Sequence, residues 1–107
     1  MIVVNTADVA GKRVARTLGL VRGNAVRARH IGRDIMAGLR GLVGGEVHEY
    51  TKLLAESREH ALDRMVEEAR LLGANGVINV RFMTSELAAN MAELLAYGTA
   101  VILEDDQ

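Results

Sequence analysis

The longest regular pattern of hydrophobic and polar positions runs from Val47 to Leu72. Hydrophobic side chains recur there every three or four residues, and charged side chains fill the positions between them. This spacing predicts one amphipathic helix of about seven turns, about 40 Å long at 1.5 Å per residue. Gly73 follows where a left-handed cap residue belongs, and Asn75-Gly76 provides a tight exit. The Gly44-Gly45 pair precedes the pattern, so we expect the helix to begin after it.

Three short segments have the composition of β-strands. Ile2 to Val4 is apolar, Val77 to Met83 is rich in β-branched residues, and Tyr97 to Leu103 is similar. Because these strands flank the long helix in sequence, the pattern favours an α+β fold in which the helix covers an antiparallel or mixed sheet.

A fourth strand is predicted from Arg13 to Val21, where hydrophobic and polar residues alternate loosely. Val14, Leu18 and Leu20 would then lie on one packed face. Gly19 and Gly23 weaken this strand. Either glycine could mark a bulge or a close approach of another backbone.

Two segments have patterns that fit more than one structure. From His30 to Val43 hydrophobic residues recur at helical spacing, but three glycines each weaken a helix there by roughly 1 kcal/mol. We therefore expect a closely packed or a broken helix. Ser85 to Ala96 favours a helix by propensity, yet Ala89-Asn90 could form the turn of a hairpin between two long strands. The residue types alone leave both structures open.

The composition is that of one small domain, covering residues 1–107. Half of the residues are hydrophobic, but only three are aromatic, so the core must consist of aliphatic side chains. The absence of cysteine excludes disulfides, thiolate metal sites and a cysteine nucleophile. No segment is apolar and long enough to span a membrane, and the N-terminus lacks the features of a signal peptide. We therefore expect a cytoplasmic protein.

Charge is distributed unequally between the two parts of the chain. Residues 1–45 contain eight basic and two acidic residues, whereas residues 46–107 contain five basic and twelve acidic residues. The simplest interpretation is that the two parts face each other, within one subunit or across a subunit boundary. Nucleic-acid binding is disfavoured, because no stacking aromatic residue stands among the arginines.

Candidate catalytic and metal-binding residues lie at the start of the long helix and near its middle. Glu46, His48 and Glu49 are the nearest approach to an acid–base cluster, but carboxylates are favoured at any helix N-terminus by the helix dipole. The protein is therefore not expected to be an enzyme. His48 and His60 are candidate metal ligands. Twelve residues separate them, too far along one helix to share an ion within a subunit. Each histidine would need carboxylate neighbours, such as Glu56 and Asp63 for His60, and a site shared between subunits is also open.

Several separated motifs carry a resemblance to a known family. They are GLVRGNA at Gly19 to Ala25, RDI at Arg33 to Ile35, AGLRGLVGG at Ala37 to Gly45 with Tyr50 five residues later, LGANGV at Leu72 to Val77, and GTAV at Gly98 to Val101. In these motifs the chain resembles the YbjQ-like family, which is labelled as heavy-metal-binding. The likeness extends over nearly the whole chain.

The resemblance implies a fold, an assembly and a ligand site. The fold is a dodecin-like β-α-β-β subunit, and the assembly is a homopentameric ring in which extra short strands join neighbours. It favours the hairpin over the helix for Ser85 to Ala96. The ligand site that it implies is lined by Arg40, Gly44, Gly45 and Tyr50. Two positions depart from the family pattern, because Gly41 replaces a common acidic residue and Glu46-Val47 replaces a basic and a small polar residue.

Taken together, these patterns predict a non-catalytic, ring-forming binding or scaffold protein with an unknown ligand. Its expected partners are further copies of itself, and neither a membrane nor nucleic acid. The alternative is a metal-binding protein with a divalent ion at or near the subunit interfaces.

Overall fold

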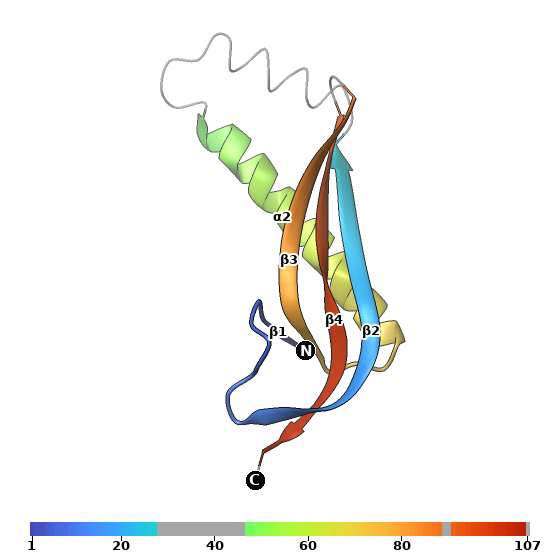
Figure 1. Cartoon of the computed structure of the whole chain (residues 1–107). Helices are drawn as coiled ribbons and strands as arrows, with labels where there is room; N and C mark the ends of the chain where they lie inside the picture. Colours follow the sequence, from blue (N-terminus) through green and yellow to red (C-terminus); the bar gives the residue numbers. More distant parts are fainter. Residues whose placement is uncertain (28–46, 89–90, 107) are drawn as a thin grey trace.

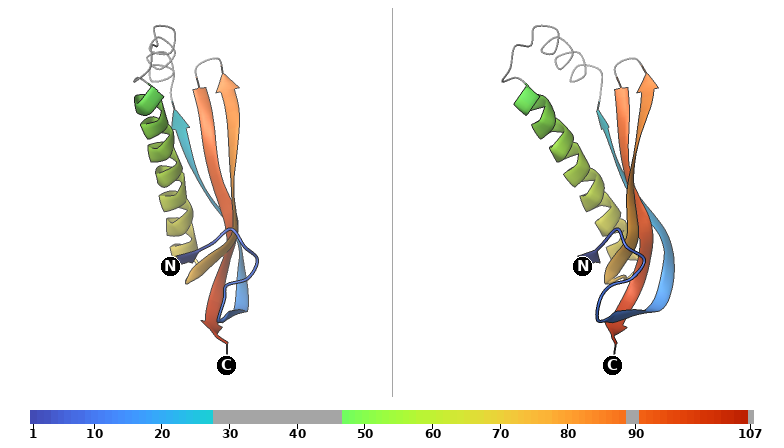
Figure 2. Two further views of the ribbon diagram at one scale, coloured as in Figure 1. Left: turned by 90° about the vertical axis from the view of Figure 1, so that its left-hand side faces the viewer. Right: turned by 60° about the vertical axis from the view of Figure 1, so that its left-hand side comes forward.

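The fold is a mixed four-stranded sheet with one long helix on one face (Figures 1 and 2). The computed structural model describes residues 1–27, 47–88 and 91–106. In chain order the elements are β1 (Ile2–Val3), β2 (Lys12–Arg27), α2 (Val47–Leu71), β3 (Gly76–Ala88) and β4 (Met91–Asp105). The strand order is β1-β3-β4-β2, with β1 parallel to β3 and the other pairs antiparallel. The predicted α+β architecture is therefore confirmed. The predicted helix from His30 to Val43 lies outside the described residues.

The C-terminal segment is a hairpin of two long strands, β3 and β4. Their register runs from Gly76 opposite Val101 to Ala88 opposite Met91. The helix alternative for Ser85 to Ala96 is therefore wrong. Cross-strand pairing over the whole of β4, with β3 on one side and β2 on the other, outweighs the helical propensity of Ala, Leu, Glu and Met.

The long helix α2 has 25 residues and ends as the sequence predicts. Gly73 has a φ of 86°, in the left-handed region. Its N–H donates to the carbonyl of Arg70 (3.0 Å), and the N–H of Ala74 donates to the carbonyl of Ala69 (3.1 Å). These two bonds form a Schellman cap, which satisfies carbonyls that the end of the helix leaves open. Glu67 and Arg70, three residues apart on the helix surface, form an ion pair at 3.4 Å.

Strand β2 extends six residues beyond the predicted end at Val21. Two irregularities interrupt its register with β4, and Gly19, with a φ of 124°, lies at the second. This bulge separates two leucines that the simple alternation placed together. Leu18 packs against the core under the helix, whereas Leu20 is exposed. The prediction of one shared face for them was wrong, because a bulge shifts the alternation of sides by one residue.

At Gly23 the backbones of β2 and α2 approach each other closely. A Cβ atom built on Gly23 would overlap the backbone atoms of Ala61, Arg64 and Met65. Any side chain at this position would therefore separate the strand from the helix. Both interpretations of the β2 glycines are confirmed, since Gly19 lies at a bulge and Gly23 allows a close approach of backbones.

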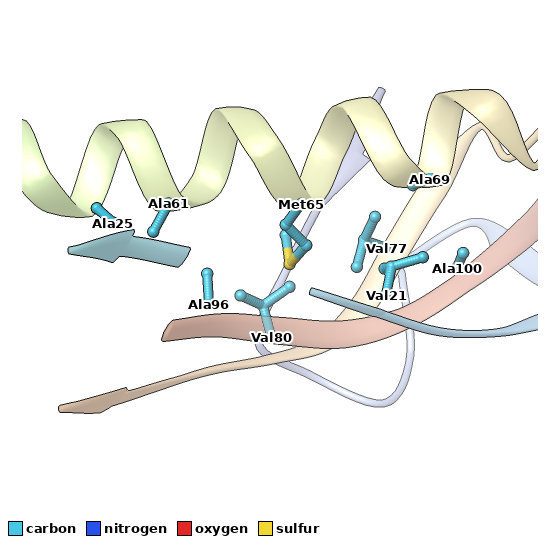
Figure 3. Close-up of a cluster of buried hydrophobic side chains, with 9 residues drawn as sticks. All are labelled: Val21, Ala25, Ala61, Met65, Ala69, Val77, Val80, Ala96 and Ala100. Atoms are coloured by element: carbon cyan, nitrogen blue, oxygen red, sulfur yellow. The ribbon is translucent and has the colours of Figure 1, made fainter. Parts of the chain in front are cut away.

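The main core lies between α2 and the sheet and is built largely from small residues (Figure 3). Met65 and Val21 are its largest fully buried members beside Val77. The rest of the cluster consists of Ala25, Ala61, Ala69, Val80, Ala96 and Ala100. Small side chains here agree with the close approach at Gly23, since large ones would hold the two layers apart.

A second, smaller cluster lies on the opposite face of the sheet. Ile78, Val101 and Leu103 are buried there under the N-terminal segment, which contributes Ile2, Val4 and Val9. The side chain of Asn75 joins this end of the sheet. Its amide nitrogen donates to the carbonyl of Leu103 (2.9 Å), and its amide oxygen accepts from the N–H of Leu103 (2.7 Å).

Candidate functional site

The ligand site predicted around the double glycine falls mostly on residues that the structure does not describe. Arg40, Gly44 and Gly45 lie outside the described residues. Tyr50 belongs to the first turns of α2, but only the backbone is described there. This ligand site therefore stays a prediction.

The two candidate metal-ligating histidines lie on α2. Twelve residues of helix place His48 and His60 about 18 Å apart along the axis, so one ion within a subunit cannot contact both. His60 is exposed. In the described part of the chain, no three His, Asp or Glu side chains come together in a way that could hold a metal ion. A site shared between subunits stays a prediction.

The described residues do form a continuous surface on the side of the sheet that faces away from α2. The strands alternate, so Val21, Gly23 and Ala25 turn toward α2 while the residues between them turn away. Among the described residues, the N-terminal segment covers the end of this side near Leu103 and leaves the other end uncovered. We call the uncovered part the open face. It consists of Leu20, Arg22, Asn24 and Val26 on β2, Glu93, Leu95, Tyr97 and Thr99 on β4, and Arg81, Met83 and Ser85 on β3.

A row of two arginines and a tyrosine crosses the open face. Arg22 on β2 lies opposite Tyr97 on β4, and Tyr97 lies opposite Arg81 on β3. Opposed residues of neighbouring strands share one face, so the two arginines flank the half-buried tyrosine. The guanidinium of Arg81 donates to the carbonyls of Asn5 (2.6 Å) and Val80 (3.0 Å), which fix its position. Arg22 is exposed and its side chain makes no ion pair with another described residue.

Apolar side chains adjoin this row. Leu20 is 60% exposed and Met83 is 53% exposed. Glu93 lies farther along β4, and its carboxylate accepts a hydrogen bond from the amide of Asn24 (3.0 Å). The open face thus combines positive charge with exposed apolar area, a combination that suits an interface better than a surface left in water.

The outer side of α2 has the opposite charge. Glu56, Glu59, Asp63 and Glu67 are exposed and follow one another at spacings of three and four residues, so they lie on one line along the helix. We call these four carboxylates the acidic ridge. Ala61, Met65 and Ala69 are buried on the opposite side of the helix, so the ridge faces away from the sheet. Leu71, which is 80% exposed, continues the line one turn after Glu67.

Within the described part of the chain, the ion pairs do not join the acidic ridge to the basic strand β2. Lys12 pairs with Asp105 (2.6 Å) and Arg13 pairs with Glu104 (2.5 Å), which connects β2 to β4. The hydrogen bond and the positive charge of Lys12 hold the pKa of Asp105 below its ordinary value. The unequal distribution of charge along the chain is therefore only partly neutralised by these contacts.

Sequence reasoning did not identify the open face as a surface. The signal was the continuation of β2 past Val21, where residues of alternating burial extend to Val26. Arg22 and Arg81 are also 59 positions apart in the sequence, and only the strand register brings them to the same row.

In the described ranges, no helix combines the length and the apolar character that a membrane-spanning segment needs. The fold is similar to that of a protein of known structure. That structure is a crystal structure of a protein of unknown function of the DUF74 family from Pediococcus pentosaceus, with a TM-score of 0.64 and 16% sequence identity. The match covers 97% of this chain and 98% of that one, which supports a shared fold.

The relatives found by sequence comparison share more of their residues with this chain than the structural relative does. The chain is 64% identical to a UPF0145 protein of Halorubrum lacusprofundi over 99 residues, covering 92% of this chain and 95% of that protein. It is 54% identical to a UPF0145 protein of Pyrococcus abyssi over 107 residues, covering 100% and 94%. A family model described as "Putative heavy-metal-binding" matches residues 1–104. The chain therefore belongs to the YbjQ family, to which its sequence motifs had already pointed.

Proposed function

We propose that this protein is a non-catalytic, cytoplasmic binding or scaffold protein that works as a homopentameric ring of dodecin-like subunits. The observation that carries the proposal is the extended shape of the subunit. Its principal extents are 58 × 26 × 16 Å and its radius of gyration is 17.2 Å. A compact chain of this length has a radius of gyration of about 13 Å.

The accessible surface supports the same conclusion. The chain exposes 7074 Å², whereas a compact monomer of 11.6 kDa exposes roughly 5,800 Å². The difference is on the order of 1,000 Å², and one partner in a stable protein interface typically buries about 800 Å². Each subunit therefore has enough additional surface for contacts with neighbours.

The arrangement of the strands also favours assembly. The helix lies mainly over β2 and β4 and barely reaches β3. On β3, Phe82 is 44% exposed on the side that the helix covers elsewhere. The outer edge of β2 pairs with no other strand among the described residues. A long unpaired strand edge usually pairs with another chain or is protected from doing so. Uncovered apolar residues often mark a surface that contacts another protein.

The ligand of the ring is proposed to bind near the double glycine. The motif residues that would line this site are Arg40, Gly44, Gly45 and Tyr50, and their support is the family resemblance. Arg40 would supply a fixed positive charge, and Tyr50 an aromatic face with a hydroxyl.

Sedimentation velocity and native mass spectrometry of the full chain at micromolar concentration test the assembly. A pentamer has a mass of about 58 kDa, five times the 11.6 kDa of one chain. The mass of a ring with another number of subunits would change the proposed number of copies and leave the rest of the proposal standing. A single folded protomer would refute the proposal.

Metal binding is the second candidate function, and the description of the family model favours it. His48 and His60 are the candidate ligands, each with carboxylates of the same or a neighbouring subunit at the interface. Calorimetric titration with Zn²⁺, Cu²⁺ and Ni²⁺ should then show heat of binding, and the bound ion should raise the melting temperature. A His48→Ala, His60→Ala double variant should lose both effects. Absence of both effects in the wild-type protein would remove this candidate.

A further inference from the structure

Figure 2 shows α2 on one side of the sheet. The acidic ridge is on the outer side of α2 and the open face is on the far side of the sheet, so the two lie on opposite sides of the subunit. We propose that the open face of one copy docks on the acidic ridge of the next copy. This inference rests on the proposed assembly and identifies the two surfaces that meet. The occupant of the open face is thus a second copy of this chain.

Charge complementarity identifies that occupant. On the open face, Arg22 and Arg81 flank Tyr97, while the carboxylate of Glu93 is held by Asn24 farther along the sheet. The ridge presents four exposed carboxylates, and Glu67 forms an ion pair with Arg70 (3.4 Å). A row of arginines facing a line of carboxylates gives attraction and fixes the register of two surfaces.

Two arginines of the helix leave much of the ridge's charge in place. Arg70 pairs with Glu67, and the guanidinium of Arg64 donates to the carbonyl of Asn24 at the edge of β2. Glu56, Glu59 and Asp63 are exposed on the ridge, where a partner can reach them. Arginine also suits such a contact, because its planar group binds a carboxylate through two parallel hydrogen bonds.

Apolar residues accompany the charges on both surfaces. Leu20 and Met83 adjoin the arginines on the open face, and Leu71 follows the acidic ridge at the end of α2. Docking would remove these side chains from water together with the charged groups. An interface that has apolar residues beside its salt bridges excludes water from area that salt bridges alone would leave hydrated.

The positions of the two surfaces also decide the symmetry of the contact. In a two-fold dimer the same patch of both copies meets, so the open face would meet a second open face, and the acidic ridge a second ridge of four carboxylates. A head-to-tail contact places opposite charges together instead. Repetition of such a contact produces a ring if the rotation closes.

Charge reversal in the full chain tests the docking. Arg22→Glu reverses a charge of the open face, and Asp63→Arg reverses a charge of the ridge. The matched control is Arg16→Glu, which makes the same change on the same strand. Arg16 lies opposite Ile102, whose neighbours Val101 and Leu103 belong to the cluster on the other side of the sheet. Arg16 therefore turns away from the open face.

We expect Arg22→Glu and Asp63→Arg each to weaken self-association by about 100-fold in sedimentation velocity at low salt. Arg16→Glu should associate like the wild-type protein. The double variant Arg22→Glu, Asp63→Arg keeps the net charge of −1 and should associate more strongly than either single variant. Circular dichroism checks that each variant is folded, and if Arg22→Glu is not, Asp63→Arg on the exposed helix surface still tests the contact.

The outcomes separate this inference from the proposed function. A wild-type protein that sediments as a single protomer refutes the assembly and the docking together. A wild-type oligomer that both reversals leave intact overturns the docking and leaves the assembly standing. The docking is also overturned if Arg16→Glu dissociates the oligomer as strongly, or if the double variant associates more weakly than both single variants.

Discussion

Replacing Gly23 by alanine tests how closely α2 packs on the sheet. The added Cβ would overlap backbone atoms of Ala61, Arg64 and Met65. Backbone atoms inside a helix cannot rotate away as the end of a side chain can. The helix must therefore move away from β2, and this movement opens the core around Met65 and Val21, which are fully buried.

The expected loss in the free energy of unfolding is about 3 kcal/mol, the upper end of the range for overpacked cores. For a domain of this size, such a loss lowers the melting temperature by roughly 12 °C or more. Urea unfolding followed by circular dichroism measures it, at a fixed protein concentration because assembly makes stability depend on concentration. Thr17→Ala on the exposed side of β2 is the control and should stay within about 0.5 kcal/mol of wild type.

A second substitution distinguishes a backbone clash from a side-chain clash. Ala61→Gly removes the methyl group of Ala61 but leaves its carbonyl oxygen in place. We therefore expect the effects of Gly23→Ala and Ala61→Gly to add, with no rescue in the double variant. Recovery of stability in that double variant, or a loss below 1 kcal/mol for Gly23→Ala alone, would refute the explanation.

Three further predictions concern the cap, the end of the sheet and the acid stability. Gly73→Ala should lower the free energy of unfolding by about 1 kcal/mol in urea, because alanine is strained at a positive φ; an unchanged value would contradict the cap. Asn75→Ala should lower it by about 2 kcal/mol, since both hydrogen bonds with the backbone of Leu103 are lost, and Asn75→Asp should restore part of the loss by keeping one acceptor. Lys12 lowers the pKa of Asp105. The ion pair therefore stabilises the folded state fully above the ordinary pKa of 3.8, and this stabilisation is lost as pH falls through the pKa of the folded state. Asp105→Asn should therefore reduce the change of the melting temperature with pH between roughly pH 5 and pH 2 in low salt. The same change with pH as in the wild-type protein would contradict this assignment.

The long helix could be predicted from sequence because its signals are local. Hydrophobic spacing, the capping glycine at Gly73 and the exit at Asn75 all lie within one segment and agree with one another. The glycines of β2 were also informative, because glycine in a strand usually marks a bulge or a close contact. Residue type could not say which of these applied to Gly19 and which to Gly23. That choice depends on where the helix crosses the strand.

The features that sequence reasoning missed depend on contacts between distant segments. The bulge beside Gly19 moves Leu18 into the core and leaves Leu20 outside, and no local pattern gives its position. The C-terminal segment forms strand β4 because it pairs with two other strands, β3 on one side and β2 on the other. The open face needed the register of all three long strands. Its row of Arg22, Tyr97 and Arg81 exists only in the folded chain.

The subunit combines a thin core with exposed apolar residues on both outer surfaces. The close approach at Gly23 requires small residues between α2 and the sheet, and the cluster accordingly contains five alanines. Such a core has little room for large side chains. Among the described residues, large apolar groups such as Leu20, Met83 and Leu71 lie on the outer surfaces. An isolated subunit would leave them in water, whereas a head-to-tail contact would cover them. The geometry that limits the core of one copy thus favours association with the next.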